Sequence, residues 1–184
     1  DTIRGNRGND IIIGGVNGAA AAAHDRLSGD EDDDVILGDN GVVAFNDDAN
    51  PDLDRIESTD FALGGGDEIS GGGGRDFALG GTGADLILGD DPLVGGTATG
   101  VGDDVLIGDQ GRILVTGGFV ASVATTDTAA SDGAADDISG NGGSDIARGG
   151  VAGDRIQGQA GKDSLLGDEG LVVFDLAGPL GDGD

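Results

Sequence analysis

The sequence predicts an all-β solenoid in which short parallel strands stack coil upon coil. Two observations predict it: a nine-residue repeat, Asp-x-apolar-x-Gly-x-x-x-x, runs through most of the 184 residues, and glycine-rich turns separate its copies. A turn at constant period after each short strand winds a chain into stacked coils. A third observation, an apolar segment after every fourth row, predicts additional strands outside the solenoid.

Twelve rows of the repeat form three blocks of four, and an aliphatic residue occupies the third position of almost every row. Ten of these twelve residues are Ile or Leu. Successive side chains of a strand point to opposite faces, so the third positions share one face. We expect them to form the core inside the coils. They are Ile3, Ile12, Leu27, Ile36, Ile69, Ala78, Ile87, Leu106, Ile138, Ala147, Ile156 and Leu165.

The residues on either side of each core position predict two different sheets. In odd rows they are mostly polar, as in Thr2 and Arg4, whereas in even rows they are mostly apolar, as in Val35 and Leu37. Arg148 and Ser164 depart from the even-row pattern. One sheet therefore faces water and the other needs a cover. The apolar segments after the blocks supply that cover, or a second molecule packs there, since large apolar patches mark interfaces.

We expect one domain, residues 1–184, made of three blocks at 1–57, 58–125 and 126–184. Within the 112–125 insertion, Thr116-Gly117-Gly118 is typical of a hairpin turn between two apolar runs. The first residue, Asp1, is not Met, which indicates a fragment or a processed product. The insertions that interrupt the repeat lie at about 18–24, 42–53, 92–102, 112–125 and 171–184.

Composition excludes several classes of protein. The chain has 36 acidic and 9 basic residues, a net charge of −27, which argues against nucleic acid because phosphate backbones need basic surfaces. Without Cys there is no disulfide or zinc-thiolate site, and the one His, His24, has no second His for a metal or catalytic motif. No run approaches ~20 apolar residues, so we expect no membrane insertion.

The acidic residues instead predict a metal site. Asp outnumbers Glu by 32 to 4, and a short carboxylate closes nearly every glycine-rich turn. Carboxylate and carbonyl oxygens are hard ligands that suit Ca²⁺. Glycines let the main chain curl so that carbonyls converge. Because the aspartates recur in every turn, a catalytic carboxylate pair is the poorer explanation, and we expect a protein that is not an enzyme.

Two rows carry a specific resemblance. Gly71-Gly72-Gly73-Gly74-Arg75-Asp76 and Gly80-Gly81-Thr82-Gly83-Ala84-Asp85 resemble the haemolysin-type (RTX) calcium-binding nonapeptide repeat. The resemblance implies a right-handed parallel β-roll that holds several Ca²⁺ ions between successive turns.

In that family, turn carbonyls and the aspartate that closes each turn hold the metal. Carried over, the turn ligands include Gly71, Gly73, Gly80 and Thr82. Four further aspartates stand where the family often has its second glycine, and they either add a carboxylate or lie in solvent: Asp39, Asp90, Asp109 and Asp168. The closing aspartates are Asp10, Asp25, Asp34, Asp76, Asp85, Asp104, Asp145, Asp154 and Asp163.

The resemblance implies a structural and folding module of a secreted bacterial protein, exported by type I secretion and folding on extracellular Ca²⁺. The expected partners are calcium ions and further repeats or domains of a longer polypeptide. The alternative function is a building block of an extracellular adhesin, S-layer or fibre that self-assembles. An intrinsic hydrolase is the least favoured of the three.

Overall fold

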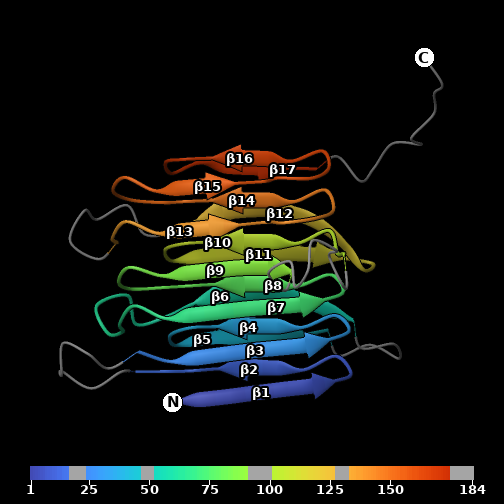
Figure 1. Cartoon of the computed structure of the whole chain (residues 1–184), viewed down its shortest axis with the longest axis horizontal. Coiled ribbons are helices and arrows are strands. Elements are labelled where there is room, and N and C mark those ends of the chain that lie inside the picture. The colour runs from blue at the N-terminus through green and yellow to red at the C-terminus, as the bar shows by residue number, and fades with distance from the viewer. Residues whose placement is uncertain (17–23, 47–51, 91–100, 127–132, 175–184) are drawn as a thin grey trace.

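The computed structural model describes residues 1–16, 24–46, 52–90, 101–126 and 133–174. These residues hold seventeen β-strands in three sheets. Figure 1 shows the coils stacked from the N-terminal coil at the bottom to β16 and β17 at the top. The all-β solenoid expected from the nine-residue period is confirmed.

Two six-stranded parallel sheets form the roll, and each row of the repeat supplies one strand. Odd rows form sheet A: β1 (Thr2–Arg7), β3 (Arg26–Glu31), β7 (Glu68–Gly73), β9 (Leu86–Asp90), β13 (Asp137–Ser139) and β15 (Arg155–Gln157). Even rows form sheet B: β2 (Ile11–Ile13), β4 (Val35–Leu37), β8 (Phe77–Leu79), β10 (Val105–Ile107), β14 (Ile146–Arg148) and β16 (Ser164–Leu166).

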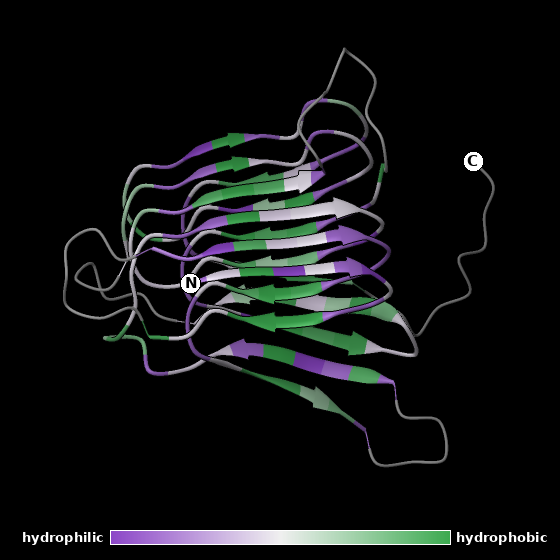
Figure 2. Cartoon of the chain, turned by 60° about the horizontal axis from the view of Figure 1, so that its bottom comes forward, coloured by the Kyte–Doolittle hydropathy of each residue, from purple (hydrophilic) through white to green (hydrophobic). Residues whose placement is uncertain are grey.

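The core between sheets A and B consists of the third-position residues, with one exception: Leu165, in the last strand of sheet B, was expected in the core but is 43% exposed, because no further coil covers it among the described residues. Ile36, Ile69, Ile87, Leu106 and Ile138 are fully buried there. The pairing register is constant, because each third-position residue lies opposite the third-position residue of the next coil. Figure 2 shows hydrophobic residues along the stacked strands and hydrophilic residues toward the turns at their ends.

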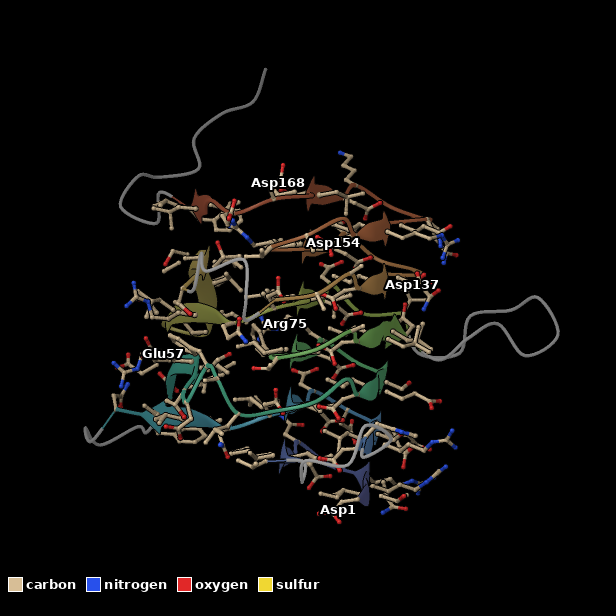
Figure 3. All side chains as sticks on the ribbon, turned by 90° about the vertical axis from the view of Figure 1, so that its left-hand side faces the viewer. Asp1, Glu57, Arg75, Asp137, Asp154 and Asp168 are labelled. Atoms are coloured by element: carbon tan, nitrogen blue, oxygen red, sulfur yellow. The ribbon has the colours of Figure 1, made fainter. Side chains whose placement is uncertain are left out.

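A third sheet covers the apolar outer face of sheet B. Sheet C is antiparallel and consists of β5 (Gly41–Phe45), β6 (Leu53–Ser58), β11 (Gly111–Thr116), β12 (Phe119–Thr125) and β17 (Leu171–Val173). Its residues Ile56, Ile113 and Val123 are fully buried in one cluster with Leu79 and Ile107 of sheet B. The cover therefore comes from within the chain, as the first of the two alternatives predicts. Figure 3 separates the layers, with Glu57 on sheet C and Asp137 on sheet A.

The inserted hairpins have the predicted position but are longer than predicted in one case. Gly117 and Gly118 form the β11–β12 turn with φ of 58° and 79°, as the Thr116-Gly117-Gly118 pattern indicates. The insertion expected at about 42–53 continues through β6 to Ser58. Insertion 18–24 lies outside the described residues except for His24, and 92–102 except for 101 and 102. The 171–184 segment is described only as far as 174.

The roll turns need left-handed main-chain conformations at two positions. In the turn before Asp76, Gly72 and Gly74 have φ of 112° and 120°. The turn 29–34 lacks these glycines, yet Asp30 and Asp32 take the same conformation, with φ of 80° and 79°. Asp tolerates this region better than most residues, so the turn is kept.

Ala152 provides a test of this strain, since it is exposed and has φ of 86°. We expect Ala152→Gly to stabilise the folded protein by about 1 kcal/mol, because glycine has no Cβ penalty in this conformation. The measurement is thermal or urea unfolding at fixed calcium concentration. The control, Ala84→Gly, changes an exposed alanine without positive φ in another turn of the same edge and should be neutral or destabilising. Equal gains from both variants would contradict the strain.

Candidate metal centre

Aspartates link successive coils in two continuous columns, one along each edge of the roll. In each link, the Oδ1 atom of an aspartate accepts a hydrogen bond from the main-chain N–H of the aspartate one coil earlier. The N···O distances are 2.8 Å from Asp34 to Asp76 and 2.8 Å from Asp76 to Asp104. One column is Asp10, Asp34, Asp76, Asp104, Asp145 and Asp163. The other is Asp25, Asp67, Asp85, Asp136 and Asp154.

The second carboxylate oxygen of most of these aspartates is buried and has no hydrogen-bond partner among the described residues. A buried anionic oxygen without a partner costs several kcal/mol, so such atoms normally mark an ion or another ligand. The Oδ2 atoms concerned belong to Asp10, Asp25, Asp34, Asp76, Asp85, Asp104, Asp136, Asp145 and Asp154.

Each of these oxygens points into a turn where only glycine fits. A Cβ atom on Gly5 would lie 2.5 Å from Asp10 Oδ2 and 2.7 Å from the carbonyl oxygen of Gly29 in the next coil. Gly71 has the equivalent neighbours, the Asp76 carboxylate and the carbonyl oxygen of Gly89 in the next coil. The first glycine of the turn thus keeps open a small space that two kinds of oxygen line.

These donors fit Ca²⁺ and not a transition metal. Calcium takes oxygen ligands, main-chain carbonyls included, at 2.3–2.6 Å in a flexible geometry. Among the described residues, no three carboxylate, imidazole or thiol groups gather as a metal cluster. Each turn instead brings one carboxylate to main-chain carbonyls. A bound calcium ion would balance the negative charge of these buried carboxylate oxygens.

Burial raises the pKa of five column aspartates well above the ordinary value of 3.8, because water no longer stabilises the ionised form. The pKa is about 6 for Asp34 and Asp145, about 7 for Asp76, and about 8 for Asp104 and Asp136. Neighbouring carboxylates add to the shift in each column. Without a cation, the folded roll therefore holds protons that the unfolded chain would release at neutral pH.

Comparison with known families identifies the repeat. The RTX calcium-binding nonapeptide repeat matches in four copies, at residues 1–16, 20–42, 61–97 and 139–170, which together are more than half of the chain. The chain belongs to this family. Comparison with curated proteins and with solved structures gives no match. RTX repeats bind several calcium ions, so the resemblance and the calcium cofactor predicted from Gly71–Leu88 are confirmed.

The structure of this RTX chain places the predicted closing aspartates in the two columns, together with two that sequence reasoning missed. Asp67 and Asp136 occupy the same position as Asp85, and the main-chain N–H of Asp67 donates to Asp85 Oδ1 at 2.6 Å. Both follow a long insertion, so the complete six-residue turn, as in 71–76, does not stand before them, although Gly64-Gly65-Gly66 directly precedes Asp67. The signal that could have found them is the row itself, since every row begins with Asp. A ligand role for each column member stays a prediction.

The predicted turn ligands fall into two groups. The carbonyl oxygen of Gly71 and the Asp34 carboxylate both lie against Gly29. The carbonyl oxygen of Gly80 and the Asp67 carboxylate lie in the same way against Gly38. Gly73 ends strand β7, and Thr82 donates its main-chain N–H to Asp39 Oδ2 at 2.6 Å. For these two, as for the others, ligation stays a prediction.

The four aspartates at the second turn position also differ from one another. Asp39, Asp90 and Asp109 are buried, and their carboxylates accept main-chain N–H groups. They do not lie in solvent. Asp168 is exposed at the top end of the stack, as Figure 3 shows.

In the described residues no helix is long and apolar enough to cross a membrane.

The raised pKa values predict how acid acts on the metal-free protein. Between pH 3.8 and about 8 the folded state binds more protons than the unfolded chain, so stability falls as pH rises. We expect the metal-free chain to be more ordered at pH 5.5 than at pH 8 by circular dichroism. Calcium at pH 8 should remove the difference. A metal-free chain that is less ordered at pH 5.5 would contradict the burial of these carboxyl groups.

Substitution of one column aspartate tests the ligand assignment. We expect Asp76→Ala to raise the calcium concentration at half-folding by tenfold or more, because it removes a carboxylate and a bond between coils, each worth about 1 kcal/mol or more. The matched control is Asp54→Ala, an exposed aspartate on β6. Calcium titration followed by circular dichroism measures both. Equal shifts for the two variants would count against the column.

Proposed function

We propose that this RTX chain is a calcium-dependent folding and structural module of a secreted protein. The observation that supports this most is a set of buried Oδ2 atoms that repeats coil after coil and that has no hydrogen-bond partner within the described part of the chain. A metal site made only when coils stack does not exist in the unfolded chain. The free energy of calcium binding is then free energy of folding.

The charge of the chain explains why the module would fold outside the cell. A net charge of −27 opposes compaction, and the columns place carboxylates of adjacent coils next to one another. Calcium modules of extracellular proteins bind at ~10⁻⁴–10⁻³ M, concentrations that the cytoplasm does not reach. The chain stays unfolded before export and folds on arrival. Type I secretion fits this sequence of events.

The module is proposed to have no catalytic role. The buried aspartates recur at equal spacing along both edges, and each is engaged with the main chain of the coil before it. A catalytic site needs one distinct constellation, and repetition supports ligation instead. The columns run through all three proposed blocks, which supports a single domain over residues 1–184.

A second candidate function, self-assembly into an extracellular fibre or layer, has one observation in its favour. Ile11 and Ile13 of β2 are 48% and 40% exposed on the face of sheet B that sheet C covers elsewhere. At the equivalent positions of the next strand, Val35 and Leu37 are 7% and 1% exposed. A further strand beside β5, from another copy or from more of the polypeptide, would cover this apolar end.

Removal of metal tests the proposal. We expect the chelator-treated chain to show little β-structure and a large hydrodynamic radius, and to fold cooperatively when calcium is added to millimolar concentration. Circular dichroism and size-exclusion chromatography measure the two changes. Magnesium is the control, since it demands a small octahedral site and keeps its waters. A compact, β-rich chain after complete removal of metal would refute the proposal.

A further inference from the structure

We propose that Asp39, Asp90 and Asp109 are positioning residues. Each closes the neck of the insertion that follows it, meaning the place where the chain leaves the roll and returns to it, and holds the adjacent turn in place for calcium. This inference rests on the proposed calcium-dependent folding for its effect on calcium affinity, but the contacts that carry it do not require a metal. It gives the three aspartates a role other than ligation.

All three aspartates stand where the chain leaves the roll. Each directly follows the first glycine of a turn, which is Gly38, Gly89 or Gly108. After Asp39 and Asp109 the chain forms the hairpins of sheet C before it returns to Asp67 and Asp136. In uninterrupted turns the same position holds a residue with positive φ, such as Gly72 or Gly81.

One oxygen of each carboxylate bonds to the end of the insertion. Asp39 Oδ1 accepts from Gly65 N at 3.2 Å, and Asp90 Oδ1 accepts from Gly102 N at 3.0 Å. Asp109 Oδ1 accepts from Ala134 N at 3.2 Å. The two sheet C insertions are therefore closed by bonds that span 26 and 25 residues.

The other oxygen bonds to the third residue of the neighbouring turn. Asp39 Oδ2 accepts from Thr82 N at 2.6 Å and Asp90 Oδ2 from Gly142 N at 2.8 Å. Asp109 Oδ2 accepts from Val151 N at 2.5 Å. Three insertions of unrelated sequence, on both edges of the roll, thus use one arrangement. A carboxylate suits it because both oxygens accept, whereas an amide offers only one acceptor.

The surroundings of these carboxylates are closed on both sides. A Cβ on Gly133 would lie 2.5 and 2.6 Å from the two carboxylate oxygens of Asp109, and a Cβ on Gly81 would lie 2.6 Å from Asp39 Oδ2. Asp90 and Asp109 are fully buried. Main-chain atoms therefore pack directly against the carboxylate oxygens of Asp39 and Asp109, where a bound ion would have to lie if these oxygens were ligands.

The contacts also explain an effect on the neighbouring candidate calcium site. Thr82 belongs to the same turn as Gly80. The carbonyl oxygen of Gly80 and the Asp67 carboxylate both lie against Gly38, where they line one candidate calcium site. Asp39 is bonded to this turn through Thr82 and, through Gly65, to the segment that leads into Asp67. It fixes both sides of the site while contributing no ligand.

The insertion that follows Asp90 allows a rescue experiment, because none of the five strands described for sheet C comes from it. In the full chain, we expect Asp90→Ala to raise the calcium midpoint about tenfold, since two charge-assisted hydrogen bonds are lost. A second chain replaces residues 89–103 by the five residues of the turn 80–84. It has no aspartate at this position and no neck to close, and its midpoint should return to within about threefold of the original chain.

Calcium counting separates positioning from ligation. At saturating calcium, equilibrium dialysis should find as many ions bound to Asp90→Ala as to the original chain, and fewer bound to Asp104→Ala. An equal loss of ions from both variants would overturn the proposal. So would a shortened chain that keeps the tenfold defect.

Amide hydrogen exchange tests the neck without relying on calcium affinity or on the alanine variant. In Asp90→Asn, which retains the shape of the side chain, the Gly102 or Gly142 N–H should lose protection while the column amide of Asp104 keeps it. Unchanged protection of both glycines would overturn the proposal. If the original chain folds without calcium, the proposed function fails, yet this exchange measurement still decides the role of Asp90.

Discussion

The hydrogen bond from one aspartate N–H to the next aspartate carboxylate is the interaction on which the rest of the structure depends. It joins coils at both edges, as between Asp76 and Asp104, and it sets their register. By occupying Oδ1, it leaves Oδ2 directed into the turn, beside the next coil's carbonyl. A single side chain therefore both spaces the coils and creates the demand for a cation.

The growth of sheet C obeys a matching constraint. Four rows add two strands to sheet B, and one inserted hairpin adds two strands to sheet C, so both layers lengthen by the same number of strand spacings. This explains why the insertions after Gly38 and Gly108 recur after four rows. A hairpin at every second row would overfill the face, and one at every eighth would leave it exposed.

The sequence predicts the roll and its core because both follow from local periodicity, as the burial of Ile36, Ile69 and Leu106 shows. The sequence does not predict β6 as a strand, because its residues Asp54, Arg55 and Glu57 are charged. Ile56 is the one large apolar side chain of β6 that is buried in the core. Arg148 was an unexplained exception. It is buried between sheets B and C, where its guanidinium donates to the Val123 carbonyl at 2.8 Å. Such contacts join residues dozens of positions apart, which no local pattern encodes.

The strands of sheet C occur in the order β5, β6, β11, β12, β17, and the coils of the roll also follow chain order. Each new coil and each new hairpin therefore packs onto material already in place and never passes beneath it. The architecture can be laid down progressively from one terminus, without threading and without rearranging earlier layers. A polypeptide that emerges end first through a narrow exit has no topological obstacle to this fold.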